Sequence, residues 1–80
     1  MFDPQVIENM IKKGMVCQSA SVTGDGHHFE AVVVSQLFEG LSTLARHRLV
    51  YATLGEKMGH EIHALSIKAM IPEQADNESA

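Results

Sequence analysis

The stretch GDGHHFEAVVVSQLFEG, residues 24–40, decides how this chain folds. It contains a Gly-Asp-Gly turn, then a valine-rich run at residues 28–35, and then a short apolar segment that ends at Gly40. Glycine and aspartate are typical of tight hairpin turns, and valine-rich runs are typical of strands. The segment before the turn, residues 15–23, contains small and β-branched residues. We therefore expect an antiparallel hairpin made by these two segments.

Helix signals lie on both sides of the hairpin. In the N-terminal segment Asp3 is placed as an N-cap and Pro4 occupies the first helical position, which predicts a helix that ends near Gly14. Beyond the apolar segment, which we expect to be briefly helical, the chain breaks at Gly40 and Ser42 is placed to cap a longer helix. Four apolar residues of that helix are predicted to share one face: Leu44, Tyr51, Leu54 and Met58.

A third strand is predicted at residues 62–71, where Pro72 ends it. The element order is helix, strand, strand, helix, helix, strand. The helical crossover between the second and third strands makes those two parallel. The fold class is therefore α+β, with a three-stranded mixed sheet and helices on one face. We expect one domain over residues 1–72 and a flexible acidic tail over residues 73–80, frayed or briefly helical.

The composition narrows the function classes. The chain has 80 residues, ten acidic against six basic, and a net charge of -4, which argues against a broad electrostatic contact with nucleic acid. The single cysteine, Cys17, excludes an internal disulfide. No apolar run reaches the length of a membrane span, so we expect a soluble cytoplasmic protein with no membrane contact. No nucleophile, base and orienting group can be assembled from these residues, which indicates a protein that is not an enzyme.

Four segments of the sequence resemble the BolA family, in the expected order and over nearly the whole chain. The matching residues are Gly24-Asp25-Gly26-x-His28-Phe29, Val33-Val34-Ser35-x-x-Phe38-x-Gly40, Arg46-His47-Arg48-x-Val50-Tyr51-x-x-Leu54 and Ile62-His63-Ala64-Leu65-Ser66-Ile67. The short Gly-Asp-Gly loop resembles the smaller bacterial BolA-like members. The resemblance implies a class II KH-like fold. It also implies a monothiol glutaredoxin as partner, with a 2Fe-2S cluster bridging the two proteins.

The resemblance implies that His63 is a cluster ligand, because the family's C-terminal histidine lies at this position. Imidazole can replace thiolate on one iron of such a cluster. The second ligand in the family comes from the loop between the first two strands, and this loop has no cysteine. Asp25, His27 and His28 are the candidates, and His27 is preferred because an exposed turn residue can move; a solvated loop residue is the alternative. Glutaredoxin and glutathione would supply the remaining ligands.

A second interpretation is a nucleic-acid-binding transcriptional regulator of the stress response, since some family members are described as DNA-binding regulators. Arg46 and Arg48 are the candidate phosphate contacts. A solvated pair that covers the edge of the core, with little effect on folding, is the favoured alternative for these two residues. No Gly-x-x-Gly loop, with which KH domains hold a nucleic-acid backbone, occurs in the chain. DNA binding is therefore expected to be weak at most.

Overall fold

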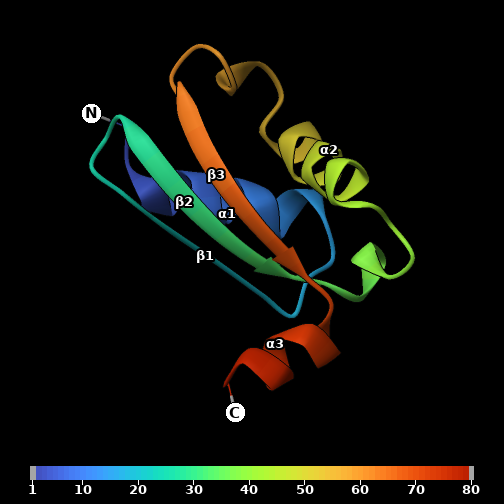
Figure 1. The fold of residues 1–80 in the computed structure, drawn as a ribbon. Helices are drawn as coiled ribbons and strands as arrows, with labels where there is room; N and C mark the ends of the chain where they lie inside the picture. Colours follow the sequence, from blue (N-terminus) through green and yellow to red (C-terminus); the bar gives the residue numbers. More distant parts are fainter. Residues whose placement is uncertain (1, 80) are drawn as a thin grey trace.

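A three-stranded sheet and two covering helices form the centre of the protein, shown in Figure 1. The computed structural model describes residues 2–79. Along the chain its elements are α1 (Pro4–Gly14), β1 (Ser19–Gly24), β2 (His28–Val34), the 3-10 turn η1 (Gln36–Phe38), α2 (Thr43–Leu54), the 3-10 turn η2 (Gly55–Lys57), β3 (Ala64–Met70) and α3 (Pro72–Ser79). The predicted element order is confirmed, with α3 as an addition at the C-terminal end.

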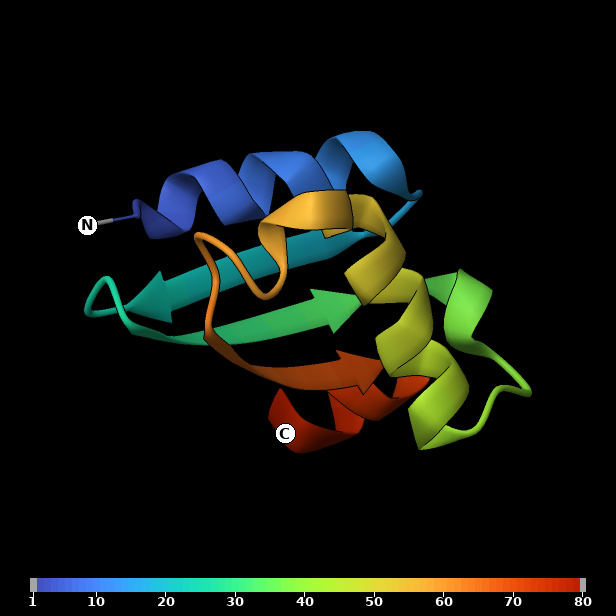
Figure 2. The same ribbon diagram turned by 90° about the horizontal axis from the view of Figure 1, so that it is seen from above.

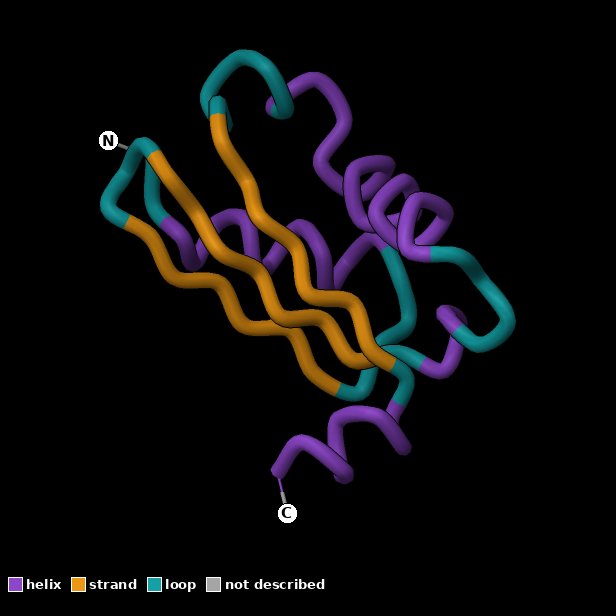
Figure 3. Tube along the Cα trace, in the orientation of Figure 1, coloured by secondary structure: helices purple, strands orange, loops and turns teal. Residues whose placement is uncertain are grey.

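The sheet is mixed, as predicted. β1 pairs with β2 in antiparallel fashion and β2 pairs with β3 in parallel, so β2 is the central strand, as the trace in Figure 3 shows. The parallel register places His28 opposite Ala64 and Phe29 opposite Leu65. Because side chains alternate along a strand, Phe29 and Leu65 lie on one face of the sheet, and His28 and Ala64 lie on the other.

The hydrophobic core lies between the sheet and the layer formed by α1 and α2, which Figure 2 shows above and beside the strands. Asp3 caps α1 by accepting a hydrogen bond from the backbone N–H of Gln5 at 2.9 Å, as its position in the sequence predicts. The largest side chains removed from solvent come from every layer: Ile7, Ile11, Phe29, Val33, Phe38, Val50, Leu54 and Ile62. Burial of this apolar surface is the main stabilising contribution to the fold.

Of the four residues predicted to share one face of α2, Leu54 is buried and Met58, just beyond the helix, packs partly buried against the core, but Leu44 and Tyr51 are exposed. Leu44 is 60% exposed and Tyr51 is 37% exposed, whereas Val50 and Leu54 are buried. Apolar residues lie on both sides of this helix, so its periodicity does not single out one face. The contact with α1 and the core selects the side that carries Val50 and Leu54.

The C-terminal residues form a short helix, which is the second of the two alternatives expected for this segment. α3 begins at Pro72 and lies on the side of β3 away from α1 (Figure 2). Its first turn is attached to the strand end, because the side-chain oxygen of Gln74 accepts hydrogen bonds from the Ile71 N–H and from Arg46, each at 3.0 Å. At the other end of the chain, β1 begins at Ser19, later than the predicted start.

Candidate functional site

The loop between β1 and β2 is organised by Asp25. Its carboxylate accepts hydrogen bonds from the backbone N–H groups of His27 and His28, both at 2.8 Å. These bonds, that from His28 first, hold the pKa of Asp25 below its usual value. Gly26 has a φ of 98°, a conformation that disfavours other residues, and it turns the chain toward His27. The carboxylate of Asp25 therefore holds the backbone of the loop at His27 and His28, and the side chain of His27 is left exposed.

A second turn, residues 57–62, lies between η2 and β3. The Gly59 N–H donates to the Ile62 carbonyl at 2.8 Å, and the Ile62 N–H donates to the Lys57 carbonyl at 2.9 Å. Lys57 also pairs with Glu61 at 2.7 Å, which lowers the pKa of Glu61. Ile62 is fully buried in the core. The buried side chain of Ile62 therefore fixes the backbone position of the adjacent His63.

His27 and His63 come together at one open pocket. The pocket has a volume of about 340 Å³ and is lined by Phe2, Gly26, His27, His60, Glu61 and His63. Sheet register explains the pairing of the two histidines. Since His28 is opposite Ala64 in the parallel pair, the residues just before them, His27 and His63, enter the two strands side by side. Both residues lie just before the strands, at the edge of the sheet where the pocket opens.

His60 is a third histidine at this pocket, and it is not among the ligands predicted from the sequence. It precedes Glu61 in the turn at residues 57–62, where its backbone N–H donates to the Lys57 carbonyl at 3.2 Å. The sequence signal is the spacing His60-Glu61-Ile62-His63, which is too short for the zinc-protease helix motif. A turn, unlike a helix, can present both of these histidines to one pocket.

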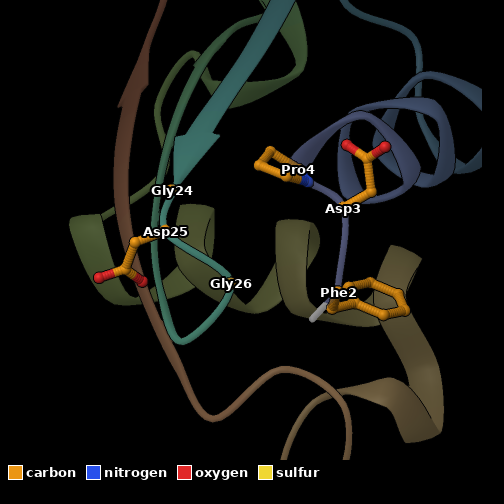
Figure 4. A pocket seen from close by; sticks show the side chains of 6 residues that line it. All are labelled: Phe2, Asp3, Pro4, Gly24, Asp25 and Gly26. Atoms are coloured by element: carbon orange, nitrogen blue, oxygen red, sulfur yellow. The ribbon is translucent and has the colours of Figure 1, made fainter.

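The other two candidate ligands lie away from this pocket. His28 is the first residue of β2, has a side chain 81% exposed, and faces the opposite side of the sheet from Phe29. Asp25 lines a neighbouring pocket, also about 340 Å³, together with Phe2, Asp3, Pro4, Gly24 and Gly26. In Figure 4 the carboxylate of Asp25 is directed away from the ring of Phe2. The geometry thus joins His63 with His27 and separates it from His28 and Asp25.

The residues at the pocket fit an incomplete metal site. Within residues 2–79 no group of three or more histidine, cysteine, aspartate or glutamate side chains is close enough to hold a metal ion. Cys17 does not contribute, because it lies before β1 and packs against the core. Two imidazoles satisfy half of the coordination of an iron that also binds two bridging sulfides. Such a pair suits a metal centre whose other ligands come from elsewhere.

The two candidate phosphate contacts differ from each other. Arg46 donates to the backbone carbonyls of Leu41 and Ala69, both at 3.1 Å, and its guanidinium lies 6.0 Å from the centre of the Phe38 ring. Its contact with Gln74 adds α3 to this set. Arg48 is exposed, as expected of a solvated residue. The expectation that both arginines are solvated is therefore wrong for Arg46, which is half-buried and connects three parts of the fold.

In the described part of the chain, none of the helices combines the length and the apolar character that crossing a bilayer requires.

Comparison with known proteins gives consistent matches. The family model for BolA-like protein matches residues 4–74. Human BolA-like protein 1 is 46% identical over 71 residues, which cover 89% of this chain and 50% of the relative. Acid stress protein IbaG of Escherichia coli is 37% identical over 82% of this chain and 80% of its own length. This chain thus spans about half the length of its BolA-like protein 1 relative and most of IbaG.

Two further matches extend the comparison. A protein of Haemophilus influenzae that carries the name DNA-binding transcriptional regulator BolA is 31% identical over 94% of this chain and 84% of that protein. The solved structure of a BolA protein homologue from Coxiella burnetii superposes with a TM-score of 0.86 at 45% identity, covering 95% of this chain and 99% of that one. By sequence and by fold, this chain belongs to the BolA family.

Proposed function

We propose that this protein is a non-catalytic adaptor that holds a 2Fe-2S cluster jointly with a monothiol glutaredoxin. His63 and His27 are the ligands on this side of the cluster. A glutaredoxin cysteine and the cysteine of bound glutathione are the ligands on the other side. The cluster is the cargo that the pair passes on.

The observation that carries the proposal is the pairing of His27 and His63 at one open pocket. The parallel register of β2 and β3 brings the two imidazoles together although they are distant in the sequence. Two nitrogen ligands on one iron, with thiolates on the other, form a known cluster arrangement with a raised reduction potential. A site with only two protein ligands requires a partner, which is the chemistry of an adaptor rather than of a storage protein.

The experiment is anaerobic cluster reconstitution with a monothiol glutaredoxin and glutathione, followed by visible absorption and circular dichroism. We expect the parent protein to give a mixed-ligand spectrum distinct from that of glutaredoxin alone. His63→Ala should abolish this spectrum, because one of two ligands is lost from a fixed position. His27→Ala should weaken it, since His60 lines the same pocket and offers a replacement imidazole.

His28→Ala is the matched control. His28 is adjacent to His27 and exposed, but it faces the opposite side of the sheet, so its removal should leave the spectrum unchanged. A His63→Ala protein that gives the parent spectrum would refute the ligand assignment. Loss of the spectrum with His28→Ala and not with His27→Ala would instead assign the loop ligand to His28.

A nucleic-acid-binding regulator is the second candidate, favoured by the name of the Haemophilus influenzae relative. Arg48 is the exposed arginine available for a phosphate, since the guanidinium of Arg46 is engaged within the fold. Titration of duplex DNA at several salt concentrations tests this candidate. Arg48→Ala should weaken binding and reduce the salt slope by about one if Arg48 contacts a phosphate. An unchanged slope would remove Arg48 from any DNA-binding surface.

A further inference from the structure

The outer face of α2 carries apolar side chains that the fold does not use. We define this outer face by Leu44, His47, Arg48 and Tyr51, which stand at positions i, i+3, i+4 and i+7 of the helix. Leu44 is 60% exposed and Tyr51 is 37% exposed. The rings of His47 and Tyr51 meet edge to face, with their centres 6.5 Å apart. Val50 and Leu54 provide the side of α2 that enters the core, and none of these four residues belongs to the core cluster.

The charge of α2 is opposite to that of the chain as a whole. The helix TLARHRLVYATL contains two arginines and a histidine and no acidic residue, while the chain has a net charge of -4. Arg46 directs its guanidinium toward the carbonyls of Leu41 and Ala69. Arg48 is exposed and forms no ion pair with any residue in the range 2–79. The outer face therefore combines two apolar side chains with one free guanidinium.

We propose that this outer face binds an acidic amphipathic helix of a partner protein. The apolar side of such a helix would cover Leu44 and Tyr51, in the way that amphipathic helices dock by anchors at helical spacing. A carboxylate beside those anchors would accept a bidentate hydrogen bond from Arg48, a geometry that guanidinium favours. The inference goes beyond the adaptor role proposed above, because it concerns a second surface.

The outer face and the histidine pocket lie on different parts of the molecule. The pocket is formed at the β1–β2 loop and the start of β3, whereas Figure 2 shows α2 next to the C-terminal ends of β2 and β3. A partner helix on α2 would leave His27 and His63 accessible. Both surfaces can then be occupied in one assembly.

Charge decides among the occupants of this face. A second copy of the chain, related by two-fold symmetry, would bring Arg48 close to its own counterpart, which like-charge repulsion disfavours. A nucleic acid would gain a single permanent cation from this face, too few for the affinity that several phosphate contacts supply. An acidic amphipathic helix would both cover the apolar side chains and pair a carboxylate with the arginine, so it is the partner that this surface fits.

The probe is a fluorescein-labelled helical peptide with leucines at helical spacing and glutamates beside them, titrated by fluorescence anisotropy. A second peptide with lysine in place of each glutamate is the charge control. We expect the acidic peptide to bind and the basic peptide to bind much more weakly. Backbone amide shifts of the 15N-labelled protein should change at Leu44, His47, Arg48 and Tyr51.

Variants locate the contact. Leu44→Ser and Arg48→Glu should each weaken peptide binding by about tenfold or more, as interface anchors do. Leu37→Ser and Lys13→Glu are matched controls, because both residues are exposed and lie on η1 and α1, and they should leave binding unchanged. His63→Ala should also leave it unchanged, which separates this surface from the proposed cluster site. Arg48→Gln, which keeps the length of the side chain, repeats the test if the charge reversal perturbs folding.

Four results would overturn the proposal. Equal binding of the acidic and basic peptides would show nonspecific hydrophobic binding that does not depend on the charge of the peptide. Weaker peptide binding by the control variants would place the contact elsewhere. Unchanged peptide binding by Leu44→Ser and Arg48→Glu would do the same. Tighter binding of duplex DNA or of phosphatidylserine vesicles than of the peptide, dependent on Arg48, would identify a phosphate-binding surface instead.

Discussion

Replacing Arg46 by alanine tests the assignment of this residue to the fold rather than to a nucleic acid. In the guanidinium of Arg46, Nε donates to the Leu41 carbonyl, and Nη1 donates to the Ala69 carbonyl and to the side-chain oxygen of Gln74. These partners belong to the segment before α2, to the end of β3 and to α3. Loss of the side chain therefore releases contacts among three parts of the chain at once.

The magnitude follows from the three hydrogen bonds. Each contributes about 0.5 to 1.5 kcal/mol net, and partial exposure of the arginine moves the expectation toward the lower end of this range. The guanidinium over the ring of Phe38 adds about 0.5 kcal/mol. We therefore expect Arg46→Ala to reduce the free energy of unfolding by about 2 to 3 kcal/mol. For a domain of this size that is a large share of the total stability.

The assay is urea unfolding followed by far-ultraviolet circular dichroism. Arg48→Ala is the matched control, because it removes the same side chain from an exposed position two residues along the same helix. Its effect should stay within about 0.5 kcal/mol, as for most surface substitutions. The difference between the two variants isolates the contacts of Arg46 from the loss of one positive charge.

Equal stability of the two variants would refute the reasoning. It would mean that water replaces the arginine at the two carbonyls without cost, and Arg46 would again be a candidate phosphate contact. If Arg46→Ala is the less stable protein and its DNA binding equals that of the parent under native conditions, the phosphate role of Arg46 is excluded.

Three further predictions concern the loop, the strand and pH. Gly24→Ala should destabilise the fold by about 1 to 3 kcal/mol in urea unfolding, because an added Cβ would lie 2.5 Å from the Phe29 ring and 2.6 Å from the His28 carbonyl oxygen. An unchanged free energy of unfolding would mean that the loop shifts freely. Ile62→Ala should cost about 2 to 5 kcal/mol and Leu65→Ala less, because Ile62 is fully buried and Leu65 only partly; the reverse order would contradict the description of the core. Asp25 has a lowered pKa in the folded protein, so its contribution to stability is present above the usual aspartate range and is lost as pH falls through the lowered value. The melting temperature of Asp25→Ala should therefore fall less steeply with acidification than that of the parent protein. Parallel curves of melting temperature against pH would argue against this role of Asp25.

The fold could be predicted from the sequence because its signals are local and agree with one another. Asp3 and Pro4 mark the start of α1, and the Gly-Asp-Gly turn fixes an antiparallel hairpin. The length of the helical crossover then determines that β3 is parallel to β2. Each of these inferences depends on a few neighbouring residues and not on the final packing.

The inner face of α2 and the role of Arg46 could not be predicted in this way. Both depend on which side of the helix meets the core, and the apolar residues on α2 allow either side. The partners of Arg46 at Ala69 and Gln74 are distant in the sequence, and no local pattern indicates them. The attachment of α3 to the rest of the fold depends in part on the same long-range contact between Arg46 and Gln74.

The register between β2 and β3 distinguishes His27 from His28, although the sequence alone leaves both as candidate ligands. The sequence favours His27 because an exposed turn residue can move, and the structure supplies a different reason. In a parallel pair with His28 opposite Ala64, the residue before β2 and the residue before β3 share one side of the sheet. A shift of the pairing by one residue would place His28 with His63 and would also turn Phe29 out of the core. Burial of Phe29 therefore agrees with the register in which His27, and not His28, lines the pocket with His63.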